Sequence, residues 1–382
     1  MEISESVKYV GAFDKELDLF ESQYKVADGI SYNSYIIKDE KTVIMDTIDR
    51  RKSNEWIQNV QKELNGTEPD YLVILHMEPD HSYNVGVLCE KYPNMKIVGN
   101  AKTFSFLSQF FEINSLEERK VIVKEGDILN LGNHSLQFFM APMVHWPEVM
   151  VAYEQTEKIL FSADAFGKFG DFNHGEDWVG EARRFYINIV GKYGVQVQAL
   201  LKKLSAVDLK MICPLHGPAL KNNLDFYIKK YDTWSKYEPE EDGILIAYSS
   251  IHGNTKEAML KLEYIMKEQG KNVVSIDLTR ADFSEAISLA FKYSKLIIAS
   301  STYNMDIFPP MKNFLNRLKG LGYQNRTIAI VENGTWVPNA ANCMNEIVSD
   351  FKDINIIEPF VTIKSRCNDA TIYDLKKLAE KL

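Results

Sequence analysis

Short apolar runs alternate with longer stretches of helical periodicity after Gly243, and no other feature of the chain limits its fold as strongly. The apolar runs cover residues 244–248, 273–278, 296–300, 327–331 and 354–363. Five strands that alternate with helices predict a parallel sheet, because the connection between parallel strands is usually a helix. We therefore predict a doubly wound α/β domain, which binds its ligand at the carboxyl ends of the strands.

Three loops at those strand ends are candidates for a ligand site. Small and hydroxyl residues follow the first strand, where backbone N–H groups can converge on a phosphate at a helix N-terminus. Neither a Walker A ending nor G-x-G-x-x-G is present, so the loop favours a mononucleotide. Each loop alone is typical of turns. The candidates are Ser250, Ile251, His252, Gly253, Asn254, Thr255, Ser301, Thr302, Tyr303, Asn304, Asn333, Gly334, Thr335 and Trp336.

Metal-ligand side chains follow predicted strands in the first part of the chain. The segment 76–81 reads His-Met-Glu-Pro-Asp-His, and Pro79 disfavours a regular helix there, which predicts an open loop. A lone histidine at a strand end is usually a hydrogen-bonded residue, but this cluster favours a metal. The full candidate set is His76, Glu78, Asp80, His81, His145, Asp164 and His216. His134 and His174 lie in polar loops and are predicted surface residues.

Imidazole and carboxylate groups without a thiolate disfavour a soft-ligand zinc site or an iron–sulfur cluster. Such a mixture around two ions suits iron, with one carboxylate bridging the pair. Zinc remains chemically permitted.

Charge and composition predict a domain boundary and exclude several classes of protein. Residues 243–382 carry 17 basic and 15 acidic side chains, whereas residues 1–242 carry 27 and 38. The change falls near residue 240, so we predict domains at 1–240 and 243–382. The net charge of −9 argues against nucleic-acid binding, and we find no membrane span or secretory signal. Four scattered cysteines favour a reducing cytoplasm.

Both parts of the chain resemble known families. The loop from Ser250 to Thr255 resembles the flavodoxin phosphate loop T/S-x-T-G-N-T, with His252 where threonine is usual. The segment from His76 to His81 resembles the His-x-His-x-Asp-His loop of metallo-β-lactamases, with Glu78 in place of the second histidine. Together with the segments 29–37 and 145–148, these motifs resemble the flavodiiron proteins (A-type flavoproteins) over nearly the whole chain.

This resemblance implies a metallo-β-lactamase-like αββα sandwich followed by a flavodoxin-like five-stranded parallel sheet. It implies FMN, with residues 250–255 at the phosphate and residues 302–304 and 334–336 beside the isoalloxazine ring. It also implies two iron ions, with Asp164 bridging them. His76, Glu78 and His145 would hold one iron, and Asp80, His81 and His216 the other. Many family members carry a histidine that approaches the substrate, but residues 21–24 here read Glu-Ser-Gln-Tyr. Tyr83 also replaces a frequent glycine and is expected to alter the pocket.

The resemblance further implies an oxidoreductase that reduces O2 to water, NO to nitrous oxide, or both, in a detoxification role. No paired C-x-x-C module is present, so we expect a separate electron donor such as a rubredoxin, a flavin reductase or a deazaflavin cofactor. A head-to-tail homodimer, or a dimer of dimers, would bring the FMN of one subunit to the irons of its partner. The unlike charges of the two domains would favour that contact weakly.

Two alternatives of another class remain open at this point. One is a dizinc hydrolase of the lactamase superfamily with an accessory flavodoxin domain, against which Glu78 counts. The other is an electron carrier with an inactive metal domain, against which the complete ligand set counts.

Overall fold

The structure, a computed structural model, describes residues 1–382 apart from the side chain of Glu176. It forms two compact units. The first comprises Met1–Tyr186 and Val195–Asp232, and the second comprises Ile187–Gly194 and Thr233–Leu382. The assignment of residues 1–240 to a metal domain and 243–382 to a flavin domain remains a prediction.

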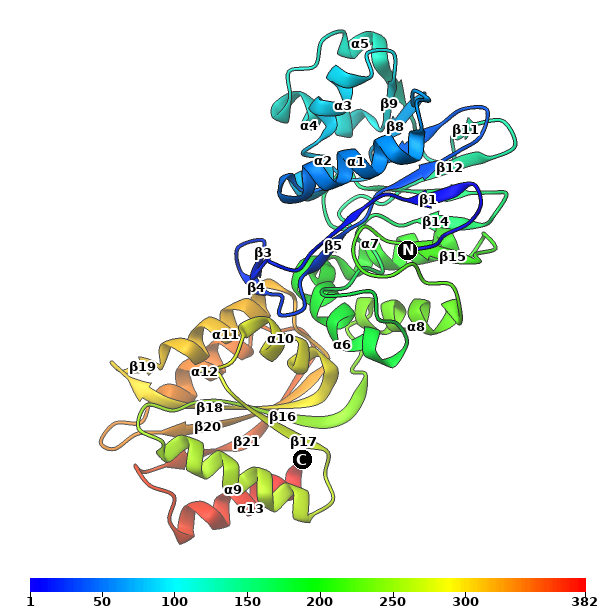
Figure 1. Cartoon of the computed structure of the whole chain (residues 1–382). Helices are drawn as coiled ribbons and strands as arrows, with labels where there is room; N and C mark the ends of the chain where they lie inside the picture. Colours follow the sequence, from blue (N-terminus) through cyan, green and yellow to red (C-terminus); the bar gives the residue numbers. More distant parts are fainter. The chain divides into compact units, whose positions relative to one another are not determined.

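Two sheets make up the centre of the first unit (Figure 1). In spatial order, the first sheet contains β1 (Val7–Tyr9), β6 (Tyr35–Ile37), β7 (Val43–Met45), β8 (Tyr71–Val73), β9 (Lys96–Gly99) and β10 (Lys120–Ile122). The second contains β11 (Ile128–Asn130), β12 (Ser135–Met140), β13 (Met150–Glu154), β14 (Ile159–Phe161) and β15 (Met211–Cys213). Two short ribbons pair β2 (Ala12–Asp14) with β5 (Ile30–Tyr32), and β3 (Leu19–Phe20) with β4 (Tyr24–Lys25).

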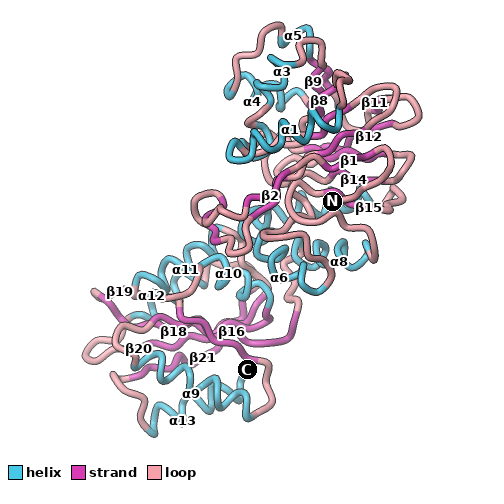
Figure 2. The backbone as a smooth tube through the Cα atoms, viewed as in Figure 1, coloured by secondary structure: helices cyan, strands magenta, loops and turns pink.

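Helices flank these sheets, which gives the predicted layered sandwich (Figure 2). Those in the segment of the first sheet are α1 (Ser53–Leu64), α2 (Pro79–Ser82), α3 (Val85–Lys91), α4 (Ala101–Phe110) and α5 (Leu116–Arg119). Those in the later segment are α6 (Glu176–Phe185), α7 (Gly194–Leu204) and α8 (Leu224–Ser235). A 3₁₀ turn at Arg50–Lys52 also lies in the first unit, whereas the 3₁₀ turn at Gly191–Tyr193 and all but the first residue of the π-helical turn at Tyr186–Val190 belong to the second. The apolar face of α1 buries Trp56, Val60 and Leu64.

The second unit confirms the predicted doubly wound sheet. Its parallel strands, in spatial order, are β17 (Val273–Asp277), β16 (Glu241–Ser249), β18 (Tyr293–Tyr303), β20 (Arg326–Asn333) and β21 (Ile354–Ile363). This order, 2-1-3-4-5 within the unit, is the flavodoxin-like one. A two-residue strand that the sequence pattern did not predict, β19 (Asp306–Ile307), pairs with β18 in the antiparallel sense.

Helices cover both faces of this sheet, which explains why its central strands are apolar throughout. On one face lie α9 (Asn254–Glu268) and α13 (Asp369–Lys381), and on the other lie α10 (Phe283–Lys292), α11 (Pro309–Gly320) and α12 (Ala340–Val348) (Figure 1). Met259, Leu262 and Met266 of α9 pack against Ile246 and Ile297 in one buried cluster. These apolar residues, which recur with helical spacing in the sequence, form the side of α9 that faces the core.

No helix among the described residues is both long enough and apolar enough to cross a membrane. The four cysteines are free thiols, with Cys89 and Cys213 buried.

Asp39 connects the two sheets of the first unit. It follows β6, and its carboxylate accepts hydrogen bonds from the backbone N–H of His134 (2.6 Å) and from His134 Nδ1 (2.9 Å), just before β12. Burial opposes ionisation, but the hydrogen bonds from His134 outweigh it and hold the pKa of Asp39 at about 2. The same contacts raise the pKa of His134. His134 is thus a partly buried structural residue rather than the predicted surface one, whereas His174 is exposed.

We predict that Asp39→Asn lowers the free energy of unfolding of this unit by about 2 kcal/mol near pH 6, the range for a hydrogen bond to a charged group. The carboxylate stabilises the fold above its ordinary pKa of 3.8, and that stabilisation is lost as pH falls toward 2. The His134 contribution is complete below 6.5 and is lost as pH rises through its raised value. Urea unfolding from pH 3 to pH 8 tests this, and equal stability of the variant at pH 6 contradicts it.

Candidate metal centre and flavin pocket

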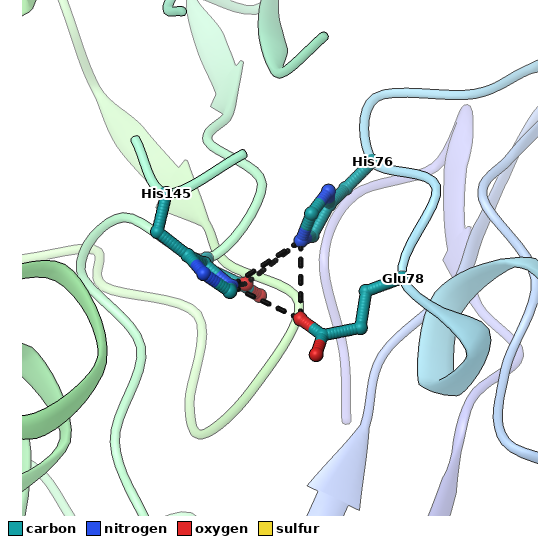
Figure 3. A group of neighbouring side chains, drawn as sticks. His76, Glu78 and His145 are labelled. Carbon is teal, nitrogen blue, oxygen red and sulfur yellow. Dashed lines mark hydrogen bonds and ion pairs between the residues drawn. The ribbon is translucent and has the colours of Figure 1, made fainter. Parts of the chain in front are cut away.

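Four side chains of the first unit come together within metal-ligand distance of one another. Figure 3 shows three of them, His76, Glu78 and His145. His76 and Glu78 follow β8, His145 follows β12, and Asp164 follows β14. Glu78 Oε2 lies 3.3 Å from His76 Nε2 and 3.0 Å from His145 Nε2. Asp164 Oδ2 lies 3.0 Å from His145 Nε2 and 3.4 Å from His76 Nε2. Two imidazole nitrogens and two carboxylate oxygens thus lie close enough together to coordinate one metal ion. We call these four residues the first ligand group.

Asp80, His81 and His216 form a second ligand group. Asp80 Oδ2 lies 3.3 Å from His81 Nε2 and 3.2 Å from His216 Nε2. The other oxygen of Asp164, Oδ1, lies 3.1 Å from His81 Nε2 and 3.7 Å from His216 Nε2. Because its two oxygens face different groups, Asp164 stands where a bridging carboxylate would stand between two ions.

The ligand segment after β8 is more regular than the sequence predicted. We expected Pro79 to keep residues 76–81 in an open loop, but α2 begins at Pro79 and includes Asp80 and His81. Proline is tolerated at the first helical position, because that residue needs no intrahelical N–H donor. The helical turn is closed by hydrogen bonds from the N–H groups of His81 and Ser82 to the carbonyl of Glu78. The helical turn therefore fixes the backbone positions of Asp80 and His81.

Hydrogen bonds from behind orient the histidines. His76 Nδ1 donates to Glu148 Oε1 at 2.8 Å, and His216 Nδ1 donates to the carbonyl of Ser31 at 2.7 Å. The Nε2 atoms then keep their lone pairs for the ligand groups. Asp46 accepts from the N–H groups of Leu75 (2.8 Å) and His76 (3.3 Å), which fixes the backbone before the ligand segment.

Several buried atoms of the second group fit a bound cation. Both carboxylate oxygens of Asp80, both ring nitrogens of His81 and Oδ1 of Asp164 make no hydrogen bond. Of these atoms, Asp80 Oδ2 and Asp164 Oδ1 lie 3.3 and 3.1 Å from His81 Nε2, and burying such groups together is costly without a cation. Burial opposes ionisation of Asp164, but the charge of His81 and the hydrogen bond from His145 outweigh it and hold the pKa of Asp164 well below its usual range. Imidazole and carboxylate donors suit iron and equally permit zinc.

Two phenylalanine rings pack against His216 of the second group. The ring centroid of Phe20 lies 5.2 Å from that of His216, and Phe185 lies 5.4 Å from it. Glu21 follows Phe20 at the turn between β3 and β4, in the neighbourhood that lacks the family's frequent histidine. Loss of hydration, followed by the charge of Glu78, raises the pKa of Glu21 to about 7. The side chain of Tyr83 is exposed.

A cavity of about 540 Å³ lies at the carboxyl ends of the strands in the second unit. All of the predicted loop residues line it except Gly253. Gly253 has a left-handed backbone (φ +95°), and α9 begins at the next residue. The N–H groups of the first turn of α9 are therefore available for a phosphate. The lining residues include no lysine or arginine, so amides and hydroxyls would hold the phosphate.

Side-chain hydrogen bonds connect the pocket loops. Thr255 Oγ1 lies 3.1 Å from Ser301 Oγ, and Asn333 Nδ2 donates to the carbonyl of Ser365 at 3.0 Å. Tyr303 is 44% exposed and Trp336 is 85% exposed, so both rings have a free face for stacking. The sequence pattern did not reveal Met305, Val337 and Ser365, which also line the cavity. Ser365 follows the fifth strand, and its position could have been inferred because ligands of such sheets bind at the carboxyl ends of the strands.

The sequence pattern of the family described as "ODP family beta lactamase" matches residues 30–217. An uncharacterized protein of Methanocaldococcus jannaschii is 30% identical over 321 residues, which cover 82% of this chain and 80% of the relative. The anaerobic nitric oxide reductase flavorubredoxin of Vibrio vulnificus is 30% identical over 361 residues, which cover 91% of this chain and 72% of the relative.

Two solved structures share the fold. The rubredoxin oxygen:oxidoreductase of Desulfovibrio gigas has a TM-score of 0.92 and 25% identity, with coverage of 100% of this chain and 96% of that one. The flavodiiron protein of Giardia intestinalis has a TM-score of 0.88 and 23% identity, with coverage of 100% and 95%.

Proposed function

This chain belongs to the flavodiiron protein family of oxidoreductases, and on that premise we propose that it binds FMN and two iron ions and reduces O2 to water, NO to nitrous oxide, or both. The observation that carries the proposal is the pair of ligand groups sharing Asp164, in one chain with a mononucleotide-sized pocket. When bound, two adjacent irons supply two electrons together, and the flavin resupplies them.

The residues of the chain have separate tasks in this proposal. His76, Glu78 and His145 hold one ion, Asp80, His81 and His216 hold the other, and Asp164 bridges them. Residues 250–255 hold the FMN phosphate, and the loops with Tyr303 and Trp336 lie beside the ring. The aromatic wall of Phe20 and Phe185 limits water at the second ligand group.

Its partners follow from the same family membership. We propose a rubredoxin-type electron donor, since two relatives carry rubredoxin in their names. We further propose cytoplasmic action and a head-to-tail homodimer in which one subunit's flavin serves its partner's irons. If the unlike charges of the two domains contribute to that contact, subunit association weakens as ionic strength rises.

Metal and flavin analysis of the purified full-length chain, followed by anaerobic reduction and exposure to O2 or NO, tests the central proposal. We expect two irons and one FMN per chain, with rapid flavin reoxidation by at least one gas. Two zinc ions with a metal site that does not change oxidation state would contradict it and favour a hydrolase.

A further inference from the structure

The two ligand groups differ in the acceptors that hydrogen-bond the Nδ1 atoms of their histidines. His76 Nδ1 donates to a carboxylate, Glu148 Oε1, at 2.8 Å, whereas His216 Nδ1 donates to a neutral backbone carbonyl at 2.7 Å. His81 Nδ1 has no hydrogen-bond partner among the described residues. Of these three histidines, His76 alone is backed by a full negative charge, and it belongs to the first ligand group.

Glu148 is held firmly in that position. Its side chain is buried, and the same Oε1 atom accepts the N–H of Met77 at 2.9 Å. Its backbone carbonyl accepts a hydrogen bond from Asn100 Nδ2 at 2.6 Å. Asn100 is in turn fixed, because its side chain caps the N-terminus of α4. Turning the carboxylate away from His76 would therefore also break its contact with the Met77 N–H, while the bond from Asn100 fixes the backbone from which the side chain extends.

A carboxylate behind a metal-binding imidazole has two effects. It fixes the tautomer in which Nδ1 carries the proton, and it increases the donor strength of Nε2. Here Nε2 of His76 faces Glu78 and Asp164 at 3.3 and 3.4 Å. Each group has three side chains of its own besides its share of Asp164, so the number of ligands does not distinguish the two groups. The carboxylate that accepts the Nδ1 hydrogen bond of His76 is therefore the difference that strengthens metal binding at the first group.

We propose that Glu148 is a positioning residue that makes the two metal positions unequal, so that the first Fe(II) binds at the first ligand group and the second group fills afterwards. This inference rests on the proposed function, which supplies the two irons. It assigns an order of assembly to the centre and gives Glu148 a role in setting that order.

The test is an anaerobic titration of the full-length metal-free chain with Fe(II) against a competing chelator. We expect two binding steps for the unmodified chain, separated by at least about tenfold in affinity. Glu148→Gln keeps the shape and an acceptor for the Met77 N–H but removes the charge. It should weaken the tighter step about 10- to 100-fold and leave the weaker step nearly unchanged.

A spectroscopic measurement identifies the order directly. With one equivalent of ⁵⁷Fe(II), Mössbauer spectra should show one dominant iron environment in the unmodified chain. The same addition to Glu148→Gln should populate two environments. A residue that only supports the fold would leave this distribution unchanged.

Glu154→Gln is the matched control. Glu154 is also buried, and its carboxylate also accepts backbone N–H groups, those of Thr156 (3.0 Å) and Glu157 (2.5 Å). This variant should leave both iron steps unchanged. Equal weakening of both steps in Glu148→Gln, or of neither, overturns the inference. Equal affinities in the unmodified chain overturn it too but leave the proposed function standing, whereas a chain that binds no iron contradicts the proposed function.

Discussion

Replacing Asp164 by asparagine is expected to reduce iron content from two per chain to one or none and to lower the rate of O2 or NO reduction by more than about 100-fold. The expected loss is larger than the loss of about 10- to 100-fold that is usual for a residue that only supports a metal ligand, because Asp164 itself faces both ligand groups. Asparagine has nearly the same size but lacks the negative charge and one of the two acceptor oxygens. Elemental analysis after anaerobic reconstitution and stopped-flow oxidation of the reduced enzyme measure the two effects.

Asp14→Asn is the control for loss of a buried aspartate in the same unit. Asp14 is equally inaccessible to solvent, but its partner is Arg51 at 2.6 Å rather than a histidine. We expect this variant to lose stability and still hold two irons. An Asp164→Asn protein that keeps two irons and normal turnover would show that Asp164 does not bridge the ions.

The second large effect is expected at the flavin pocket. Gly253→Ala should weaken FMN binding at least about tenfold, because alanine at φ +95° costs about 1–2 kcal/mol and shifts the loop before α9. A Cβ atom there meets no neighbour within 4 Å, so the effect comes from the backbone rather than from a clash. Quenching of FMN fluorescence during titration of the FMN-free chain gives the dissociation constant.

Gly270 offers a control near the other end of α9. It also has a left-handed backbone, at φ +75°, and a Cβ atom at this position would likewise meet no neighbour within 4 Å, but Gly270 lies outside the pocket lining. Gly270→Ala should lose similar stability without any loss of FMN affinity. If both variants bind FMN equally well, residues 250–255 do not cradle the phosphate.

The sequence was sufficient to predict much of the flavodoxin-like unit. Each of its five strands is marked by an apolar run, and loop residues at strand ends must gather at one edge of a parallel sheet. The exception is β19, whose two residues carry no periodic signal. Met305 and Val337 were not predicted, because an apolar side chain in a loop is not by itself a sign of a ligand-binding residue.

At the metal centre, the residues that support the candidate ligands were harder to predict than the ligands themselves. The candidate ligands could be named because each follows an apolar strand, and the structure brings all seven together. Glu148, in contrast, lies 72 residues from its partner His76, and residue spacing cannot reveal a contact between loops of different sheets. Pro79 was misread for a local reason, since the same residue that breaks a helix interior suits its first position.

The candidate ligands come from both sheets of the sandwich, with residues 76–81 after β8 and His145, Asp164 and His216 after strands of the other sheet. A metal held by both layers acts as a ligand of the folded state and shifts the folding equilibrium by mass action. At a free iron concentration 100 times the dissociation constant, this linkage is worth about 2.7 kcal/mol per site. With iron as the proposed ligand, the melting temperature of the protein should therefore rise with the concentration of free Fe(II), and iron starvation should leave the chain more open to proteolysis.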